Sequence, residues 1–409
     1  MDIPGLPARR AALRLLDAVL HRGETLDSAA HNACQGIVGG PDRALARALA
    51  AEALRWMTDL DGLIDAAMRL PLADDAKVRS VLRLMLAGWL RLDTPPHAVI
   101  ATALPLLVGG PRRLAHGVFS TLVKQDVKLP KSPSLPEAVA DRWGEGAAAI
   151  AAGLTVPPPL DLILRDPATT TEWAERLGGV SLIPGHVRLP RGDAIENLAG
   201  FDEGAWWVQD LAASIPAHLL GAGNERRVLD LCAAPGGKTL QLAAAGWLVT
   251  ALDMSAKRLE RLAENLSRTG LSATLVEADM LEWQPGAPFD AVLLDAPCTA
   301  TGTCRRHPDV LHRIGARHIA EMSELQSTLL ERAAKWLKPG GRLVYAVCSQ
   351  EHEEGEDQAR KVTLTPDPIS ADELPDGIDP TSEGWLRTDP GMLKWSGGLD
   401  GFFAARWQA

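Results

Sequence analysis

The sequence lacks a long apolar segment, and this absence limits where the protein can work. No apolar run among its 409 residues reaches the length of a membrane span. Near the N-terminus, Arg14 and Asp17 interrupt the first apolar pattern, so we expect no signal peptide. The sequence therefore predicts a protein without a membrane partner.

Closely spaced cysteine pairs are also missing. The chain has five cysteines, an odd number, and none of them forms a C-x-x-C pair. In a chain of this length, scattered thiols are typical of free cysteines in a reducing cytosol. The spacing also argues against a metal site built from Cys298, Cys304 and His307. We expect a cytoplasmic monomer that binds no metal.

The chain has no overall excess of positive charge, which argues mildly against a nucleic-acid partner. Its net charge is −10, whereas phosphate contacts require Lys and Arg. The charge is unevenly distributed, however. Residues 1–130 hold 16 Lys and Arg against 13 Asp and Glu, and the remainder holds 26 against 39. An RNA partner would have to be held by local basic patches.

The length and the periodicity predict more than one domain. Residues 1–128 show apolar positions at helical spacing and predict an all-helical domain. Residues 129–225 contain proline-rich stretches and a mixed pattern, which predict a linker and a small α+β lead-in region. Residues 226–409 change period and predict a third domain. No internal repeat is visible.

The third domain is predicted to contain a mostly parallel, Rossmann-like α/β sheet, because short apolar strands alternate with helical segments. The expected strands are 228–232, 249–253, 274–278, 291–295, 343–347 and a last one at 402–406, and the expected helices are 240–245, 256–269 and 319–336. Residues 352–383 are acidic and rich in Pro and Asp, and we expect them to form a surface loop.

A glycine turn follows the first strand of this domain, in the sequence DLCAAPGGKT from Asp230 to Thr239. Such a turn lets a ligand approach the backbone at the switch point of an open sheet. A P-loop would need glycine where Cys232 stands, and the dinucleotide fingerprint G-x-G-x-x-G is absent. The turn therefore predicts a nucleoside cofactor other than a dinucleotide or a nucleoside triphosphate.

Aspartates end four of the predicted strands, namely Asp230, Asp253, Asp279 and Asp295. An acidic side chain after the second strand commonly reaches ribose hydroxyls. Any single aspartate here is best explained as a cap for the following helix or turn. Four at equivalent places favour instead a binding site for a nucleoside that carries a cationic sulfonium.

Two thiols fall at the same predicted sheet edge, since Cys298 follows the fourth strand and Cys348 ends the fifth. A thiolate that attacks C6 of a pyrimidine makes C5 nucleophilic enough to accept a methyl group. A base must then remove the C5 proton. The two cysteines supply a nucleophile and a candidate base, although spacing cannot tell which is which. Cys34 and Cys232 are more simply explained as small buried residues.

At these motifs the chain resembles the RsmB (Sun-type) family of RNA cytosine-5 methyltransferases. Asp230–Thr239 matches the family's cofactor loop, and Asp295–Gly302, continuing through Arg305–Asp309, matches its substrate-side loop. The N-terminal helices resemble the NusB-like RNA-binding domain of bacterial members. The resemblance covers nearly the whole chain, and it implies a class I methyltransferase that uses S-adenosylmethionine on RNA, with small-subunit ribosomal RNA as the favoured substrate.

The resemblance also implies a role for each matching residue. It makes Cys348 the nucleophile and Cys298 the group that assists proton removal and product release, although in related DNA enzymes the Pro-Cys thiol attacks. It implies that Asp295 also hydrogen-bonds the target base. The residues that would contact S-adenosylmethionine are Cys232, Ala233, Ala234, Pro235, Gly236, Gly237, Lys238, Asp253, Asp279 and Asp295.

The chain departs from the family pattern at a few positions. Val347 stands where Thr is usual before the nucleophile, Gly355 where Asn is common, and Arg165-Asp166 where Val-Asn is usual. The first two leave activity expected, whereas the third bears on how the middle region grips RNA. The candidates for holding RNA phosphates, each of which could also be an ordinary solvated residue, are Arg9, Arg10, Arg112, Arg113, Arg305 and Arg306.

Other functions remain open at this stage. The chain could be a catalytically silent RNA-binding assembly factor, although it retains both cysteines and all four strand-end aspartates. It could methylate a protein or a small molecule, but direct transfer to N or O needs no covalent thiol adduct. Transfer RNA remains an alternative substrate.

Overall fold

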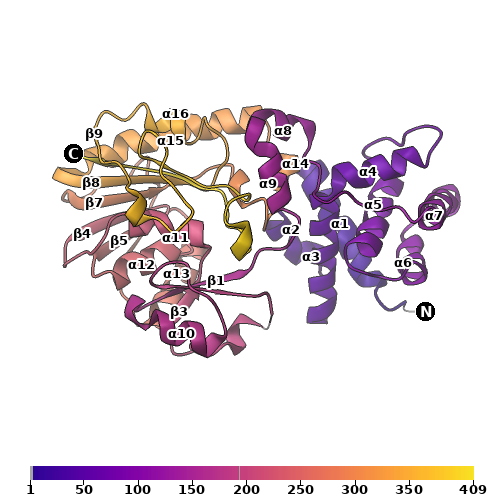
Figure 1. Cartoon of the computed structure of the whole chain (residues 1–409), viewed down its shortest axis with the longest axis horizontal. Coiled ribbons are helices and arrows are strands. Elements are labelled where there is room, and N and C mark those ends of the chain that lie inside the picture. Colours follow the sequence, from indigo (N-terminus) through magenta and orange to yellow (C-terminus); the bar gives the residue numbers. More distant parts are fainter. Residues whose placement is uncertain (1–2, 193) are drawn as a thin grey trace. The chain divides into compact units, whose positions relative to one another are not determined.

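The computed structural model describes residues 3–192 and 194–409, and by its internal contacts the chain forms two compact units. The first contains the residues up to Thr155 together with the segment Cys304–Ile314, and the second contains Val156–Thr303 and Gly315–Ala409. Figure 1 traces both along the sequence. The predicted division into three domains, with boundaries at residues 128 and 225, stays a prediction.

The first unit is a helical bundle arranged around α5 (Lys77–Leu90). Nearly every residue of α5 is buried, as expected for a helix that has neighbours on all sides. The other helices are α1 (Leu6–Arg22), α2 (Leu26–Ala33), α3 (Gly40–Arg55), α4 (Met57–Ala66), α6 (Pro96–Ala103), α7 (Gly109–Lys124), α8 (Glu137–Trp143), α9 (Ala147–Gly153) and α14 (Val310–Arg313).

Two buried arginines attach α5 to α4. Arg83 donates to both carboxylate oxygens of Asp61, at 2.8 and 2.7 Å, and Arg79 reaches Asp65 at 2.7 Å. A planar guanidinium matches a carboxylate in this two-pronged geometry, so these ion pairs also fix how the two helices are oriented.

The segment Cys304–Ile314 lies far along the chain yet packs into the helical unit. Arg55 donates to the backbone carbonyl of Arg305 at 3.0 Å, and the His312 ring hydrogen-bonds the carbonyl of Leu54 at 2.7 Å. His307 lies 3.3 Å from a carboxylate oxygen of Asp27. The chain thus enters the helical unit a second time, in the middle of the sequence that builds the other unit.

The second unit is built on a mostly parallel sheet with the strand order β10-β11-β8-β7-β4-β5-β6. Strands β4 to β8 pair in parallel, and β11 returns antiparallel to β8. The strands are β4 (Arg227–Leu231), β5 (Leu248–Asp253), β6 (Thr274–Glu277), β7 (Phe289–Asp295), β8 (Leu337–Val347), β9 (Thr365–Pro366), β10 (Leu386–Arg387) and β11 (Phe403–Gln408). The order reverses at β4 and β7, which is where open sheets of this kind bind ligands.

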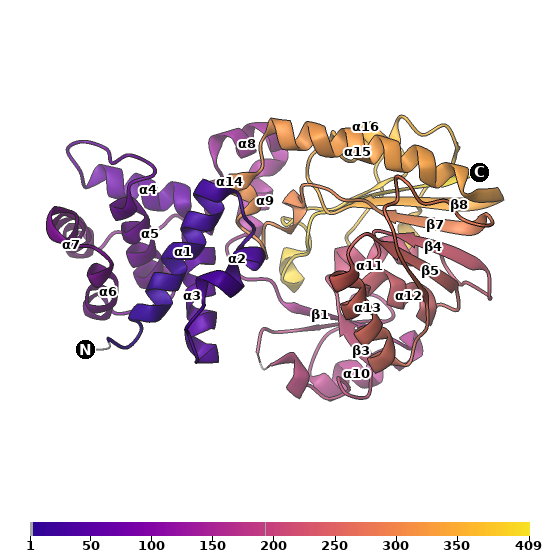
Figure 2. The ribbon, with the colours of Figure 1, turned by 180° about the vertical axis from the view of Figure 1, so that it is seen from behind.

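Helices cover both faces of this sheet, as Figures 1 and 2 show from opposite sides. One apolar core lies between the sheet and α11 (Leu211–His218), α12 (Gly237–Ala244) and α13 (Ala256–Thr269). The other lies between the sheet and α15 (Ala316–Lys335). Because successive strand residues point to opposite faces, Val228 joins the first core and Leu229 the second.

A small antiparallel sheet precedes the large one, with the order β2-β1-β3. Its strands are β1 (Leu160–Leu164), β2 (His186–Leu189) and β3 (Trp206–Val208), and α10 (Thr170–Leu177) packs against it. Asp161 on β1 accepts hydrogen bonds from Arg188 at 2.6 and 2.7 Å and from the Leu211 backbone N–H at 3.0 Å. This buried carboxylate therefore ties the small sheet to α11.

The predicted fold class is confirmed, since an all-helical region precedes a mostly parallel methyltransferase-like sheet. One expectation was wrong. The acidic segment 352–383 is not only a surface loop, because it contains α16 (Glu356–Ala359) and because Glu354 and Glu356 are buried. Their carboxylates are hydrogen-bonded inside the unit, which a count of acidic residues cannot foresee.

The Asp161 network predicts a pH-dependent contribution to stability. Burial alone would raise the pKa of Asp161, but hydrogen bonds and charge from Arg188 and His186 outweigh it and hold the pKa below its usual value. The stabilisation is therefore fully present above the unfolded pKa of about 4 and is lost as the pH falls below it. We expect Asp161→Asn to lower the free energy of unfolding by about 3 kcal/mol at neutral pH.

Urea unfolding followed by tryptophan fluorescence, between about pH 7 and about pH 3.5, measures this difference. The gap between the parent protein and Asp161→Asn should narrow as the pH falls. Glu175→Gln, which alters an exposed carboxylate on α10, serves as the control and should change little. A gap that stays constant over the whole range would contradict the assignment.

Candidate active site

Two thiols lie side by side at the carboxyl edge of the large sheet. Cys298 follows β7 and Cys348 follows β8, and these strands pair in parallel with Asp295 opposite Ala346. The two Sγ atoms are 3.4 Å apart, and both residues are half-buried. The structure thus brings together the two cysteines that the sequence placed at one sheet edge.

The Cys298 thiol is held in its protonated form. Hydrogen bonding with Cys348 is the largest cause that raises the pKa of Cys298 well above its usual value, followed by burial and by nearby negative charge, including that of Glu354. Cys298 therefore keeps its proton near neutral pH.

A buried ammonium lies beside the thiols. Lys238 on α12 donates to Asp295 at 2.8 Å, and its Nζ lies 5.2 Å from the centre of the Phe402 ring. Burial would lower the pKa of Lys238, but Asp295 and Cys348 raise it, and the net shift is upward. The lysine therefore stays charged, and its positive charge acts on Cys348 as well as on Asp295.

The loop between β4 and α12 is shaped by glycine. Gly236 has φ +111°, and a Cβ at this position would lie 2.2 Å from Cδ1 of Leu262 on α13. Cys232 at the start of the loop also adopts a positive φ, 59°, which is uncommon for a residue with a side chain. Asp253 accepts from the backbone N–H of Ala234 at 3.1 Å, which fixes the loop against the end of β5.

Three carboxylates converge on this loop. Burial and the charges of Asp295, Asp253 and Asp230 raise the pKa of the Cys232 thiol to about 12. Cys232 is therefore a neutral, inert thiol. Burial also raises the pKa of Asp230 to about 7, even though Thr239 donates a hydrogen bond to it at 2.5 Å. The concentration of negative potential suits a cationic ligand.

The strand-end aspartates are not all equivalent. Asp253 is buried and also accepts from the Ser255 N–H at 3.0 Å, so it serves the loop and the following helix together. Asp279 follows β6 and is exposed, and its side chain accepts from the Leu281 N–H at 2.8 Å. For Asp279 the contact is of the capping kind.

Two of the basic residues proposed for phosphate binding need correction. Arg305 is 1% exposed and Arg9 is 8% exposed, so neither guanidinium is available to a phosphate. Arg10, Arg112 and Arg113 are exposed, and Arg306 is half-buried. Sequence letters cannot distinguish a surface arginine from one that is held inside a helical bundle.

One buried carboxylate beside the thiol-bearing segments was not singled out by the sequence analysis. The carboxylate of Glu354, in the turn after β8, is completely buried and accepts hydrogen bonds from Thr299 and Ser349. These residues directly follow Cys298 and Cys348. Its position in an acidic run concealed it, and no spacing rule would have found it.

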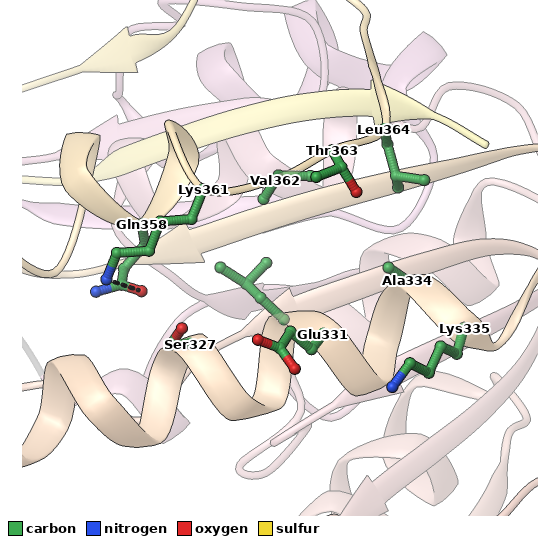
Figure 3. Close-up of a pocket in the computed structure, with 10 residues that line it drawn as sticks. Ser327, Glu331, Ala334, Lys335, Gln358, Lys361, Val362, Thr363 and Leu364 are labelled. Atoms are coloured by element: carbon green, nitrogen blue, oxygen red, sulfur yellow. Dashed lines mark hydrogen bonds between the residues drawn. The ribbon is translucent and has the colours of Figure 1, made fainter.

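A separate pocket of about 440 Å³ lies away from these residues (Figure 3). It is bordered by the second half of α15, including Glu331 and Lys335, and by the segment from Gln358 to Leu364. Neither thiol nor any residue of the glycine loop lines it, so we do not assign the chemistry to this pocket.

In the part of the chain that the structure describes, no cluster of three or more His, Cys, Asp or Glu could hold a metal, and no helix is long and apolar enough to cross a membrane.

Two family models match the chain, one in its helical part and one in the part that contains the large sheet. Residues 217–408 match the family model described as 16S rRNA methyltransferase RsmB/F, and residues 6–108 match the NusB family. A protein of Xylella fastidiosa named ribosomal RNA small subunit methyltransferase B is 33% identical, with 98% of each chain covered. The chain belongs to the RsmB/F family. It is therefore an RNA methyltransferase, and the predicted family and class of activity are confirmed.

Further relatives extend this RsmB/F assignment. A protein of the same name from Salmonella paratyphi B is 32% identical, with 97% of each chain covered. The solved structure of PH0851 matches over 99% of both chains with a TM-score of 0.71 at 23% identity, which shows the shared fold. A methyltransferase homologue from Pyrococcus horikoshii matches 71% of this chain and 97% of its own, with a TM-score of 0.54 at 25% identity.

The glycine loop of this RsmB/F protein yields a direct test. We expect Gly236→Ala to weaken binding of S-adenosylmethionine by at least about tenfold, because the methyl group collides with Leu262 and the residue must keep a positive φ. The measurement is isothermal titration calorimetry. Gly246→Ala is the matched control, since Gly246 also has a positive φ, 80°, but a Cβ there would meet nothing closer than 3.8 Å.

The collision and the backbone requirement can be separated. Combining Gly236→Ala with Leu262→Ala removes the collision but leaves the positive φ, so cofactor affinity should recover in part. Wild-type affinity in the single Gly236→Ala variant would show that the loop does not form the cofactor site.

Proposed function

We propose that this protein transfers a methyl group from S-adenosylmethionine to C5 of a cytosine in small-subunit ribosomal RNA, through a covalent adduct with Cys348. The observation that carries the proposal is the pair of thiols 3.4 Å apart at the carboxyl edge of β7 and β8. Methyl transfer to nitrogen or oxygen requires no thiol, whereas transfer to C5 of a pyrimidine requires a nucleophile and a base.

The residues of the glycine loop fit S-adenosylmethionine. Cys232 to Lys238 would hold it with Asp253, Asp279 and Asp295, and the carboxylates near Cys232 match the charge of a sulfonium. Gly236 lets the loop pack directly against Leu262, where any side chain would collide, and so keeps the loop in its bent shape. When bound, the cofactor supplies the methyl group as an electrophile. The remaining steps belong to side chains of this protein and to the RNA.

The first half of the reaction uses Cys348. Its sulfur forms a bond to C6 of the cytosine, the C5=C6 π bond breaks, and the electron pair moves onto C5 and the conjugated C4–N3 unit, which makes C5 nucleophilic. The pKa of the nearby Lys238 is raised by Asp295 and by Cys348, so its ammonium stays charged beside this sulfur. Asp295, held by Lys238 and partly exposed, is the group that hydrogen-bonds the base.

The second half uses Cys298. Cys348 is the main cause of the raised pKa of Cys298, so conversion of Cys348 into a thioether removes that cause. Cys298 can then lose its proton to solvent and, as a thiolate, take the proton from C5. The electron pair re-forms the C5=C6 bond, and Cys348 leaves C6 as a thiolate. The same two sulfurs thus act in a fixed order.

The relatives support ribosomal RNA as the substrate, since those from Xylella fastidiosa and Salmonella are named small-subunit rRNA methyltransferases. A cytosine stacked in RNA must be turned out to reach a half-buried thiol. We assign RNA binding to the NusB-like helices, with Arg10, Arg112 and Arg113 as exposed phosphate contacts.

Incubation with tritium-labelled S-adenosylmethionine and ribosomal RNA from cells that lack this protein tests the reaction. Nuclease digestion should place the label in 5-methylcytidine. Label in another nucleoside would refute C5 chemistry. If only transfer RNA or only a pre-ribosomal particle were methylated, that RNA or particle would replace free ribosomal RNA as the assigned substrate.

The two thiols should respond differently to substitution. Cys348→Ser should reduce methyl transfer by at least about a thousandfold, because no adduct forms at C6. Cys298→Ser should still form the adduct but release it slowly, so a protein–RNA species should accumulate on a denaturing gel. Accumulation in Cys348→Ser instead would reverse the two roles. Cys34→Ser, a change in the helical unit, is the matched control and should behave like the parent protein.

A further inference from the structure

Glu354 is buried beneath the two thiols and accepts four hydrogen bonds with one carboxylate. One oxygen accepts from the Thr299 backbone N–H at 2.9 Å and from the Gln326 side chain at 3.0 Å. The other accepts from the hydroxyls of Thr299 and Ser349. A carboxylate is an acceptor with about four lone-pair sites, so the donor set matches its capacity.

The donors come from the segments that carry the two thiols. Thr299 is the residue after Cys298, and Ser349 is the residue after Cys348. Gln326 on α15 also donates to the carbonyl of Pro297 at 2.9 Å, which fixes the other side of Cys298. Glu354 therefore links the two chain segments that carry Cys298 and Cys348.

A second layer of contacts holds the same two segments together. The Gly302 N–H donates to the carbonyl of Cys348 at 3.0 Å, and the Gln350 N–H donates to the Thr301 hydroxyl at 3.0 Å. Ala300, which lies between Thr299 and Thr301, adopts a positive φ of 57°. A loop bent in this way persists only where its surroundings hold it, and here the contacts of Thr299 with Glu354 and of Thr301 with Gln350 hold it on either side.

We propose that Glu354 is a positioning residue that sets the positions of the two sulfurs, acting through Thr299 and Ser349. This inference rests on the proposed function, because the position of each sulfur matters only if the thiols act on the base. Its carboxylate is completely buried under Thr299 and Ser349, so we assign it no contact with substrate. Displacing a reacting group by about 1 Å can cost about a hundredfold in rate.

The test uses single-turnover methyl transfer by the full-length protein. Glu354→Ala should slow the transfer by about a hundredfold, while the dissociation constants for S-adenosylmethionine and RNA stay within about twofold of the parent values. Glu354→Gln keeps the shape and can still accept from the Thr299 N–H, so it should recover most of that loss. This split between rate and affinity, with rescue by the amide, would not follow from a general loss of stability.

Two further variants identify the path of the effect. Thr299→Val removes one hydroxyl donor to Glu354. If the two residues act as a unit, the double variant Thr299→Val with Glu354→Ala should be no slower than Glu354→Ala alone. Asp161→Asn alters an equally buried carboxylate in the same unit and should lower stability without changing the single-turnover rate. Parent-like transfer by Glu354→Ala, or an equal loss in Asp161→Asn, would overturn the proposal.

The Cys298→Ser background distinguishes failure of this inference from failure of the proposed function. If that variant accumulates the RNA adduct and Glu354→Ala does not slow its formation, Glu354 has no positioning role and the cysteine mechanism stands. If no adduct forms in Cys298→Ser while it still methylates RNA, the cysteine mechanism itself is wrong. The positioning role is then rejected with it.

Discussion

The parallel pairing of β7 with β8 is the constraint on which the site depends. Asp295 lies opposite Ala346 in the sheet, so the segments that follow the two strands leave the same edge together. That pairing brings Cys298 and Cys348 within 3.4 Å although they are separated by 50 positions in the chain. Register is strongly specified in a buried sheet, because a slip of one residue would turn every side chain to the opposite face.

Charge around the site is arranged in two layers. Near the glycine loop, carboxylates predominate and keep Cys232 protonated. Near the thiols, the buried ammonium of Lys238 is paired with Asp295. Buried charges are tolerated only when they are paired, and here Lys238 and Asp295 are paired across the gap between α12 and β7. The same ion pair therefore connects the region assigned to the cofactor with the region assigned to the base.

The sheet and the motifs could be predicted from the sequence because apolar periodicity and turn glycines are local signals. Strands β4 to β8 are recognisable from their apolar runs, and the loop after β4 from Gly236. The short strands β2 and β3 could not be foreseen, because their pairing with β1 depends on residues distant in the chain. The burial of Glu354 and of Arg305 was not foreseen for a related reason. Both are charged residues whose burial is decided by the packing around them and not by their neighbours in sequence.

Because Cys304–Ile314 returns to the helical unit, no single cut in the chain separates the two units. This segment begins six residues after Cys298, and the packing of Arg305 depends on helices at the opposite end of the sequence. A fragment that begins at Val156 would keep the segment and lose the helices that bury it. Exchange of the N-terminal helices would therefore change the surroundings of a segment that begins six residues after Cys298.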